Sequence, residues 1–236
     1  MNAMMQSYTL YLRTLLGAAM IMLALLCVPK AAHAQDITSG LVGHWTLDET
    51  SGTTAVDSSG YSNDGTMNGG LDAGTDSVAG QIGTALDFNG VGDYVIHFNV
   101  TDDFTITDPW TISCWANIDT IPLDHAPACG LQVSGGNNRV GIGTSGTSVG
   151  GDDVKIISSG ETPGQGSATF IIGQWHHLTL VWDGTEFDAH FDGVYSYSVT
   201  PSGTGWQASN SMVAGYRGQS PYDFWDGGVD DVRLYN

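Results

Sequence analysis

Basic residues are scarce in this chain, which has six Lys and Arg against 25 Asp and Glu and a formal net charge of −19. Two of the six, Arg13 and Lys30, lie close to the N-terminus, and the rest of the chain has only four basic residues. So few scattered cations cannot form the basic stripe with which proteins bind nucleic acid, and an anionic membrane surface would repel the chain. The acidic surface of the protein itself, by contrast, would attract divalent cations.

A hydrophobic run long enough to span a bilayer is also missing. The run Leu15–Val28 has 14 residues, whereas a transmembrane helix needs about 20. Arg13 precedes this run and Ala32-His33-Ala34 follows it, in the order of a secretory signal with its charged start, apolar core and small-residue cleavage site. The sequence predicts a signal peptide over residues 1–34 and a secreted or cell-surface domain over residues 35–236.

Cysteine is sparse, with three in the whole chain. Cys27 lies within the expected signal peptide, which leaves Cys114 and Cys129 in the exported part. An isolated pair in an oxidising compartment forms one disulfide in the simplest case. Closing a loop of about 15 residues would stabilise the fold by roughly 3 kcal/mol in the chain-entropy model. No zinc-type spacing of Cys and His accompanies the pair.

Helical periodicity is absent after the signal, where short alternating segments are punctuated by Gly, Asn, Asp and Ser. Asp183-Gly184 and Asp192-Gly193 each lie between strand patterns and indicate hairpins, because Gly accepts a positive φ without steric cost. The sequence therefore predicts an all-β, two-sheet antiparallel sandwich in one domain. The expected strands are Leu41–Leu47, Ala85–Phe88, Tyr94–Phe98, Trp110–Ile118, Gly130–Val133, Arg139–Ile142, Val154–Ile157, Trp175–Trp182, Phe187–Phe191, Val194–Val199, Met212–Tyr216 and Val229–Tyr235.

Six short motifs occur in the order found in one known family. The chain resembles laminin-G-like jelly-roll domains of the concanavalin A-like lectin/glucanase superfamily from Gly40 to Asn236. The resemblance implies a jelly roll of two curved sheets, often with one calcium ion, that serves as an extracellular binding or adhesive module. The motifs are the opening segment Gly40–Gly65, Ala85–Phe88, Asp93–Val95, Trp110–Trp115, Trp175–Leu178 with Asp192-Gly193, and Gly228–Tyr235.

A structural calcium ion is the expected cofactor. Calcium takes six to eight oxygen ligands from carboxylates, amides and carbonyls in loops. Asp57 and Asn63 lie in a Gly- and Ser-rich loop, and Asp230 has the parity of the inward residues of the last strand, where a carboxylate needs a partner. First and last strands are neighbours in a jelly roll, so we expect Asp57, Asn63 and Asp230 to share the ion, with Asp48 as a further candidate. In the alternative, Asp57 and Asn63 are ordinary turn residues.

Catalytic patterns of this superfamily are lacking. Its retaining glucanases need two carboxyl groups about 5 Å apart, whereas Glu49, Glu161 and Glu186 are the only glutamates here and lie far apart in sequence. Adjacent residues of a strand point to opposite faces, so His176 and His177 cannot bind one metal ion. The sequence therefore predicts a protein that is not an enzyme. We expect the tryptophans at positions 45, 115, 175 and 182 in the core.

Two sets of residues are candidates for ligand binding. Tyr216, Tyr222 and Phe224 lie in a Gly- and Pro-punctuated loop, where exposed aromatic rings could stack on sugars, although Phe224 could instead close the edge of the sandwich. Asn137 and Asn138 belong near the same sheet face. The leading hypothesis is a calcium-stabilised module that binds glycan or extracellular protein. The alternatives are an adhesive surface protein that packs with itself or with matrix, and a non-catalytic fragment of a larger extracellular enzyme.

Overall fold

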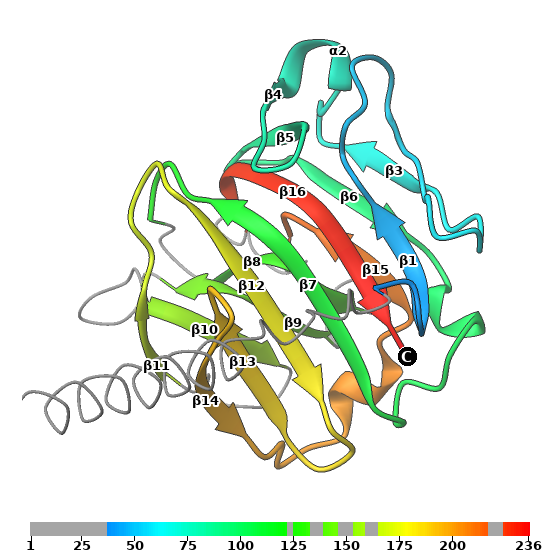
Figure 1. The fold of residues 1–236 in the computed structure, drawn as a ribbon, viewed down its shortest axis with the longest axis vertical. Coiled ribbons are helices and arrows are strands. Elements are labelled where there is room, and N and C mark those ends of the chain that lie inside the picture. Colours follow the sequence, from blue (N-terminus) through cyan, green and yellow to red (C-terminus); the bar gives the residue numbers. More distant parts are fainter. Residues whose placement is uncertain (1–36, 122–124, 133–138, 146–152, 159–164, 217–223) are drawn as a thin grey trace, which may run out of the picture. The chain divides into compact units, whose positions relative to one another are not determined.

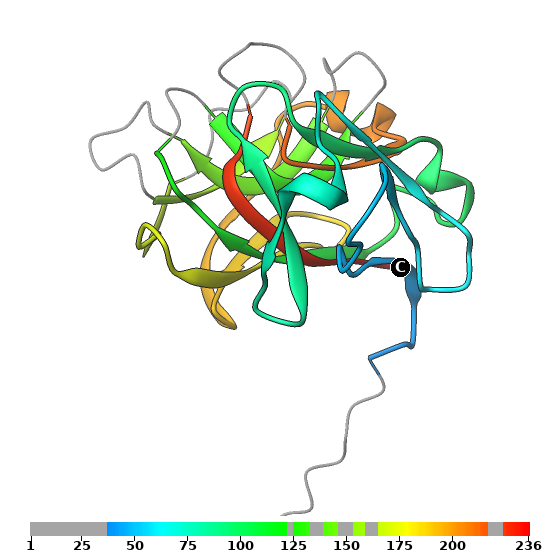
Figure 2. The same cartoon turned by 90° about the horizontal axis from the view of Figure 1, so that it is seen from above.

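Two β-sheets packed face to face make up the folded unit, Thr38–Asn236 (Figures 1 and 2). This computed structural model describes residues 37–121, 125–132, 139–145, 153–158, 165–216 and 224–236. All strand pairs of both sheets are antiparallel, as in the sandwich predicted from the sequence. Within the described ranges, no helix is long and apolar enough to cross a membrane.

The first sheet, called sheet 1 below, has the order β14-β13-β12-β7-β16-β5-β4, and β1 also pairs with β16. Its first and last strands in sequence are therefore neighbours, as the jelly-roll resemblance implies. The strands of sheet 1 are β1 (Leu41–Trp45), β4 (Ser77–Ala79), β5 (Thr84–Asn89), β7 (Trp110–Asn117), β12 (Trp175–Trp182), β13 (Phe187–Phe191), β14 (Val194–Val199) and β16 (Asp226–Tyr235).

The second sheet, sheet 2, has the order β11-β10-β9-β8-β15-β6-β3-β2. Its strands are β2 (Thr54–Ala55), β3 (Gly65–Asn68), β6 (Tyr94–His97), β8 (His125–Gln132), β9 (Arg139–Ser145), β10 (Asp153–Ser158), β11 (Gln165–Thr169) and β15 (Ser211–Ala214). Short helical turns in the described segments connect strands: α2 (Ala73–Asp76), η1 (Val100–Asp102) and η2 (Gly205–Ala208).

The hairpins of sheet 1 follow directly from local sequence. Buried and half-buried residues alternate along β12 without a break, which is the period-2 pattern of a strand with one face on the core. Asp192 and Gly193 both have positive φ values, 51° and 75°, as the turn between β13 and β14 requires. The Asp192 carboxylate also accepts a hydrogen bond from the His177 backbone N–H (2.9 Å), so the turn is tied to β12.

A bulge in β16 changes which neighbour the strand pairs with. Before it, β16 pairs with β5 through Asp226–Val229, and after it β16 pairs with β1. The register against β7 shifts between Asp230 and Arg233, and Asp231 has a φ of 52°. The side chains of the consecutive residues Asp230 and Asp231 therefore lie in different surroundings.

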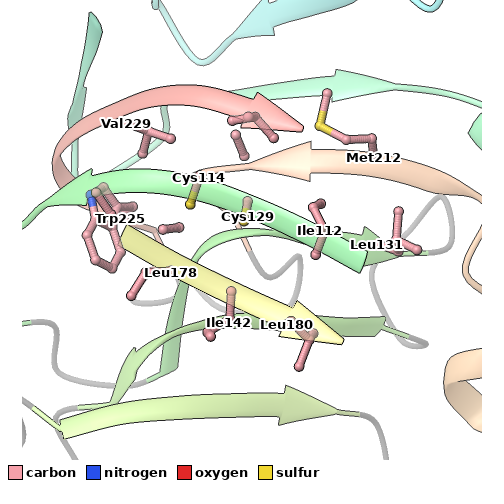
Figure 3. Packing of buried hydrophobic residues seen from close by; sticks show 14 of the residues in the cluster. Ile112, Cys114, Cys129, Leu131, Ile142, Leu178, Leu180, Met212, Trp225 and Val229 are labelled. Atoms are coloured by element: carbon pink, nitrogen blue, oxygen red, sulfur yellow. The ribbon is translucent and has the colours of Figure 1, made fainter. Parts of the chain in front are cut away.

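The apolar core lies between the two sheets (Figure 3). Trp45 and Trp182 belong to it, as predicted, together with Trp110, Trp206 and Trp225. Trp115 and Trp175 do not, so their assignment to the core was wrong. Both residues are half-buried at positions whose strand neighbours face the core, because side chains alternate between the two faces of a strand.

Candidate functional site

Three aromatic side chains form a ladder at one end of sheet 2. Tyr94 begins β6, and Tyr216 follows β15 and forms an isolated bridge with Phe224. The rings of Tyr216 and Phe224 are stacked, with centroids 4.5 Å apart and planes 14° from parallel. Tyr94 and Tyr216 are 5.0 Å apart with planes tilted by 34°. All three residues are half-buried, so the ladder remains accessible to solvent.

The ladder joins two of the predicted ligand-binding residues, Tyr216 and Phe224, and adds Tyr94, which the sequence did not single out. Tyr216 is the middle ring, with a neighbour on either side. The outward faces of Tyr94 and Phe224 are therefore the ones that a planar or ring-shaped ligand could cover. The other predicted members, Tyr222, Asn137 and Asn138, lie outside the described residues.

A small depression beside Tyr216 holds polar side chains. Its lining includes Gln132 at the end of β8 and its register partner Arg139 at the start of β9, together with Pro127 of β8 and Val213 of β15. Gln132 is only 3% exposed, and within the described part of the chain its Oε1 atom accepts no hydrogen bond. A buried acceptor without a donor costs about 1–3 kcal/mol. The depression has a volume of about 10 Å³, room for a single water-sized group, so one hydroxyl that donates to this oxygen would recover that energy.

Asp57 stabilises its own loop through hydrogen bonds, as expected if it is an ordinary turn residue. Its Oδ1 atom accepts hydrogen bonds from the backbone N–H groups of His44 and Ser59, both at 2.9 Å. Its Oδ2 atom accepts from the Ser59 hydroxyl (2.8 Å) and the Asn63 N–H (2.9 Å). Burial opposes ionisation, but these donors outweigh it and hold the pKa of Asp57 below its ordinary value. Four donors already surround the carboxylate, which therefore does not fit the role of a calcium ligand.

Asn63 is likewise engaged with the protein. Its side-chain N–H₂ group donates to the carbonyl of Val42 (2.9 Å) and to Asp103 Oδ2 (2.8 Å). Its backbone carbonyl accepts from the indole N–H of Trp45 (2.7 Å). Asn63 thus fixes the loop to β1 and to the core.

Asp230 and Asp48 lie around a different feature, the hairpin turn between β4 and β5. Asp230 is fully buried and accepts from the Ile82 N–H (2.8 Å), whereas Asp48 accepts from the Thr84 N–H (2.7 Å). The expectation that Asp230 meets the Asp57 loop was wrong, because the β16 bulge turns its neighbour Asp231 to His44 in that region. Of the four predicted calcium ligands, Asp57 and Asn63 therefore lie in one loop, whereas Asp230 and Asp48 lie at the β4–β5 turn.

The second oxygen of Asp230, Oδ1, accepts no hydrogen bond from the described residues. Burial raises the pKa of Asp230 to about 6, and the charges of Asp231 and Asp48 add to the effect. An orphaned carboxylate oxygen, with the second carboxylate Asp48 bound to the same hairpin turn, fits one side of a calcium site. Among the described residues, no group of three or more His, Cys, Asp and Glu is arranged to hold a metal ion. Any calcium here would thus need backbone or water oxygens.

Asp231 forms a charge-paired network on the other side of the strand. Its Oδ1 lies 2.7 Å from His44 Nε2, and its Oδ2 lies 3.0 Å from Arg233 Nη2. Burial works against ionisation, but the His44 hydrogen bond and the Arg233 charge keep the pKa of Asp231 below its usual range. Ser58 Oγ is 2.9 Å from His44 Nδ1, which links the network to the Asp57 loop.

The two cysteines are free thiols in this structure, so the disulfide predicted from the sequence is not present as a bond. They are nevertheless direct neighbours across the core, since Cys114 in β7 and Cys129 in β8 are joined by a side-chain hydrogen bond (Figure 3). Full burial raises the pKa of the Cys114 thiol well above its ordinary value. The disulfide stays a prediction, which this placement permits.

The two adjacent histidines point to opposite faces, as expected. His176 is buried, with Nδ1 2.9 Å from Asp192 Oδ2 and its ring 4.5 Å from that of Phe191. His177 is half-buried and packs on Trp115 instead. They cannot ligate one ion.

Comparisons with known proteins place this geometry in a wider context. The family model Laminin_G_3, described as concanavalin A-like lectin/glucanases superfamily, matches residues 89–236. No protein of curated function matches the sequence. Domain 4 of a GH43 extracellular arabinanase from Geobacillus stearothermophilus, solved in complex with arabinotriose, matches the structure with a TM-score of 0.64. The two are 19% identical over 84% of this chain and 93% of that domain.

Two further solved structures share the architecture. A Trypanosoma rangeli sialidase matches with a TM-score of 0.61 and 16% identity, over 84% of this chain but only 30% of the sialidase. The binding domain of botulinum neurotoxin serotype D/C matches with a TM-score of 0.57 and 12% identity, over 83% of this chain and 48% of that one. Such identities establish the fold alone. With the family model matching most of the chain, the protein belongs to the Laminin_G_3 family of the concanavalin A-like lectin/glucanases superfamily.

Proposed function

We propose that this chain is an exported, non-catalytic module that binds a neutral glycan at the aromatic ladder of sheet 2. The observation that carries the proposal is the buried, unpaired Oε1 of Gln132 in a depression that Tyr216 also lines. Sugar rings have apolar faces that stack on aromatic rings and hydroxyl edges that donate hydrogen bonds. The ladder offers the first kind of contact and Gln132 the second.

Three further points favour a glycan over other ligands. The arabinanase domain that shares the fold was solved with a bound arabinotriose. The formal charge of −19 repels anionic polymers, whereas a neutral sugar meets no such barrier. The two glutamates in the described residues, Glu49 and Glu186, lie outside the ladder, and Glu49 Oε1 instead accepts the Val56 N–H (2.8 Å). Binding without chemistry is the function that these groups support.

Calcium is part of the proposal as a structural ion, held by Asp230 and Asp48 at the β4–β5 turn. This ligand set replaces the one expected from the sequence, since Asp57 and Asn63 are engaged elsewhere. The role assigned to the ion is to satisfy the orphaned Oδ1 of Asp230 and to stabilise the turn against β16.

Gln132→Leu provides the test of the glycan site. Leu removes the unpaired amide but keeps most of the volume, so thermal stability should be unchanged or higher. Affinity for sugar should fall about tenfold, because a hydrogen bond of about 1–2 kcal/mol is lost. Isothermal titration with arabinotriose, and affinity electrophoresis in gels that contain arabinan, xylan, mannan or β-glucan, would measure it. Wild-type protein that binds none of these would refute the proposed function.

A further inference from the structure

The outer face of sheet 1 carries two tryptophans that the core does not use. On β12 the residues facing away from the core include Trp175, His177 and Thr179, and on the neighbouring β7 they include Ser113 and Trp115. Trp115 is the register partner of His177, and Asn117 is that of Trp175. The two tryptophans are therefore diagonal neighbours on adjacent strands, with Cα atoms about 7–8 Å apart in a regular sheet.

Trp175 lies against the sheet rather than standing up from it. A Cβ atom built on Gly228 of β16 would meet three atoms of the Trp175 benzo ring, at 2.6, 3.0 and 3.4 Å. Gly228 is next to Val229, whose register partner is Ala116, so the indole reaches from β12 across β7 to β16. The benzo end of the indole thus covers the glycine, while Trp175 as a whole remains partly exposed. Any side chain at this position would displace the ring.

His177 connects this indole with the second one. Its ring centroid is 5.0 Å from that of Trp115, with planes 60° apart, and its Nδ1 is 3.4 Å from the Thr179 hydroxyl. Burial holds the pKa of His177 below its ordinary value, so the ring is neutral at pH 7. Aromatic surface and neutral hydrogen-bonding groups therefore alternate along this part of the sheet.

The charged groups beside the tryptophans are mostly acidic. Asp231 is bonded to His44 and Arg233 at 2.7 and 3.0 Å, whereas Asp87, the register partner of Gly228 on the same face, has other aspartates as its charged neighbours. Burial and these neighbours raise the pKa of Asp87. A second copy of the chain would bring a like charge of −19, and an anionic polymer would be repelled for the same reason. A neutral chain that stacks on the indoles and hydrogen-bonds to polar side chains is the occupant that this charge pattern favours.

We infer that the outer face of sheet 1 is a second glycan-binding surface, formed by Trp175 and Trp115 with His177 and Thr179. This inference rests on the proposed function. It makes the module bivalent, with one glycan surface on each sheet, so that two chains of a polysaccharide can be held together. Simultaneous use of both surfaces raises the overall affinity for a polymer above that of either surface alone.

Separate variants of the two surfaces distinguish this inference from the proposed function. Trp175→Ala removes the platform of sheet 1, Phe224→Ala shortens the ladder of sheet 2, and Phe98→Ala is a control because it truncates another exposed aromatic residue that neither surface includes. Titration with arabinotriose should give two sites in the wild type and the control, and one site in each surface variant. Retention of arabinan in gels should fall on the order of tenfold in each single variant.

Trp175→Phe serves as the conservative variant should Ala disturb the fold. In a Phe224→Ala background, sugar should still change the tryptophan fluorescence, and this change should be lost when Trp175 and Trp115 are both replaced by Phe. Two sites in the Trp175→Ala protein, or a fluorescence change that persists without both tryptophans, would overturn the second surface and leave the ladder proposal intact. Wild-type protein without any affinity for the sugars would overturn both.

Discussion

A carboxyl group that is buried with too few donors holds its proton more tightly, and Asp230 is such a group. Its folded-state pKa of about 6 lies above the unfolded value near 3.8, mainly because of burial. The native state then binds the proton more tightly than the unfolded state. The free energy of unfolding should therefore fall by about 2 kcal/mol as the pH rises from about 4 to about 6, out of about 3 kcal/mol between the fully protonated and fully ionised group.

Asp230→Asn tests this residue, because the amide keeps an acceptor for the Ile82 N–H but cannot titrate. In the absence of calcium, the wild type should lose stability relative to the variant over that pH range in urea unfolding, whereas the exposed control Asp108→Asn should follow the wild type. Calcium favours the carboxylate, so adding it should raise the midpoints of the wild type and of Asp108→Asn but not that of Asp230→Asn. Parallel pH profiles for all three proteins would contradict the account.

At the scale of elements, β7 and β8 offer the chain a covalent link between its sheets. Cys114 and Cys129 face each other in the core. Oxidation by a disulfide such as oxidised glutathione would join the sulfurs, release two protons and pass two electrons to the oxidant. Protein purified from an oxidising compartment should then lack free thiols under denaturing conditions and have a mass lower by two hydrogens.

Dithiothreitol supplies the complementary measurement. It should lower the unfolding midpoint of the oxidised wild type by an amount that corresponds to about 3 kcal/mol. The midpoint of a Cys114→Ala, Cys129→Ala protein should not respond. Two titratable thiols in protein purified from an oxidising compartment would disprove the disulfide.

Strands could be predicted from sequence wherever the local pattern carried enough information. The bounds of β12, β13 and β14 agree with the expected ones, because strict alternation and Asp-Gly turns mark both ends. The edge strands β2 and β4 were missed, since two or three residues are too few to show a period. The strands β3 and β11 and the first part of β8, His125–Cys129, were also missed.

The candidate sites depend on neighbours that no local pattern reveals. Tyr94 and Tyr216 meet because β6 pairs with β15, more than a hundred residues away in sequence. Asp231, and not the expected Asp230, reaches the region of the Asp57 loop through His44, because a bulge shifts the parity of β16 by one residue. Alternation was visible around Trp115 and Trp175, but a preference for burying tryptophan outweighed it in the prediction, although Trp is rarely buried completely.

At the scale of the whole molecule, the net charge of −19 leads to a prediction about how the salt concentration affects the affinity for a ligand. A neutral glycan exchanges no counterions with the protein, so raising the sodium chloride concentration should leave its affinity unchanged within about twofold. Titrations with arabinotriose at low and high salt would measure this. An affinity that rises strongly with salt would instead identify an anionic ligand, because screening reduces its repulsion by a protein of charge −19.

The pairing of β1 with β16 has a topological consequence. The Asn236 N–H donates to the Gly40 carbonyl at 2.8 Å, so the polypeptide enters and leaves the sandwich at a single point. Such a unit can be spliced into a surface loop of another protein without stretching either partner. It should also tolerate circular permutation, with the old ends joined by a short linker and new ends opened at the exposed Gly184 turn between β12 and β13. The order in which the strands are connected along the chain should therefore matter less to this fold than the contacts between them.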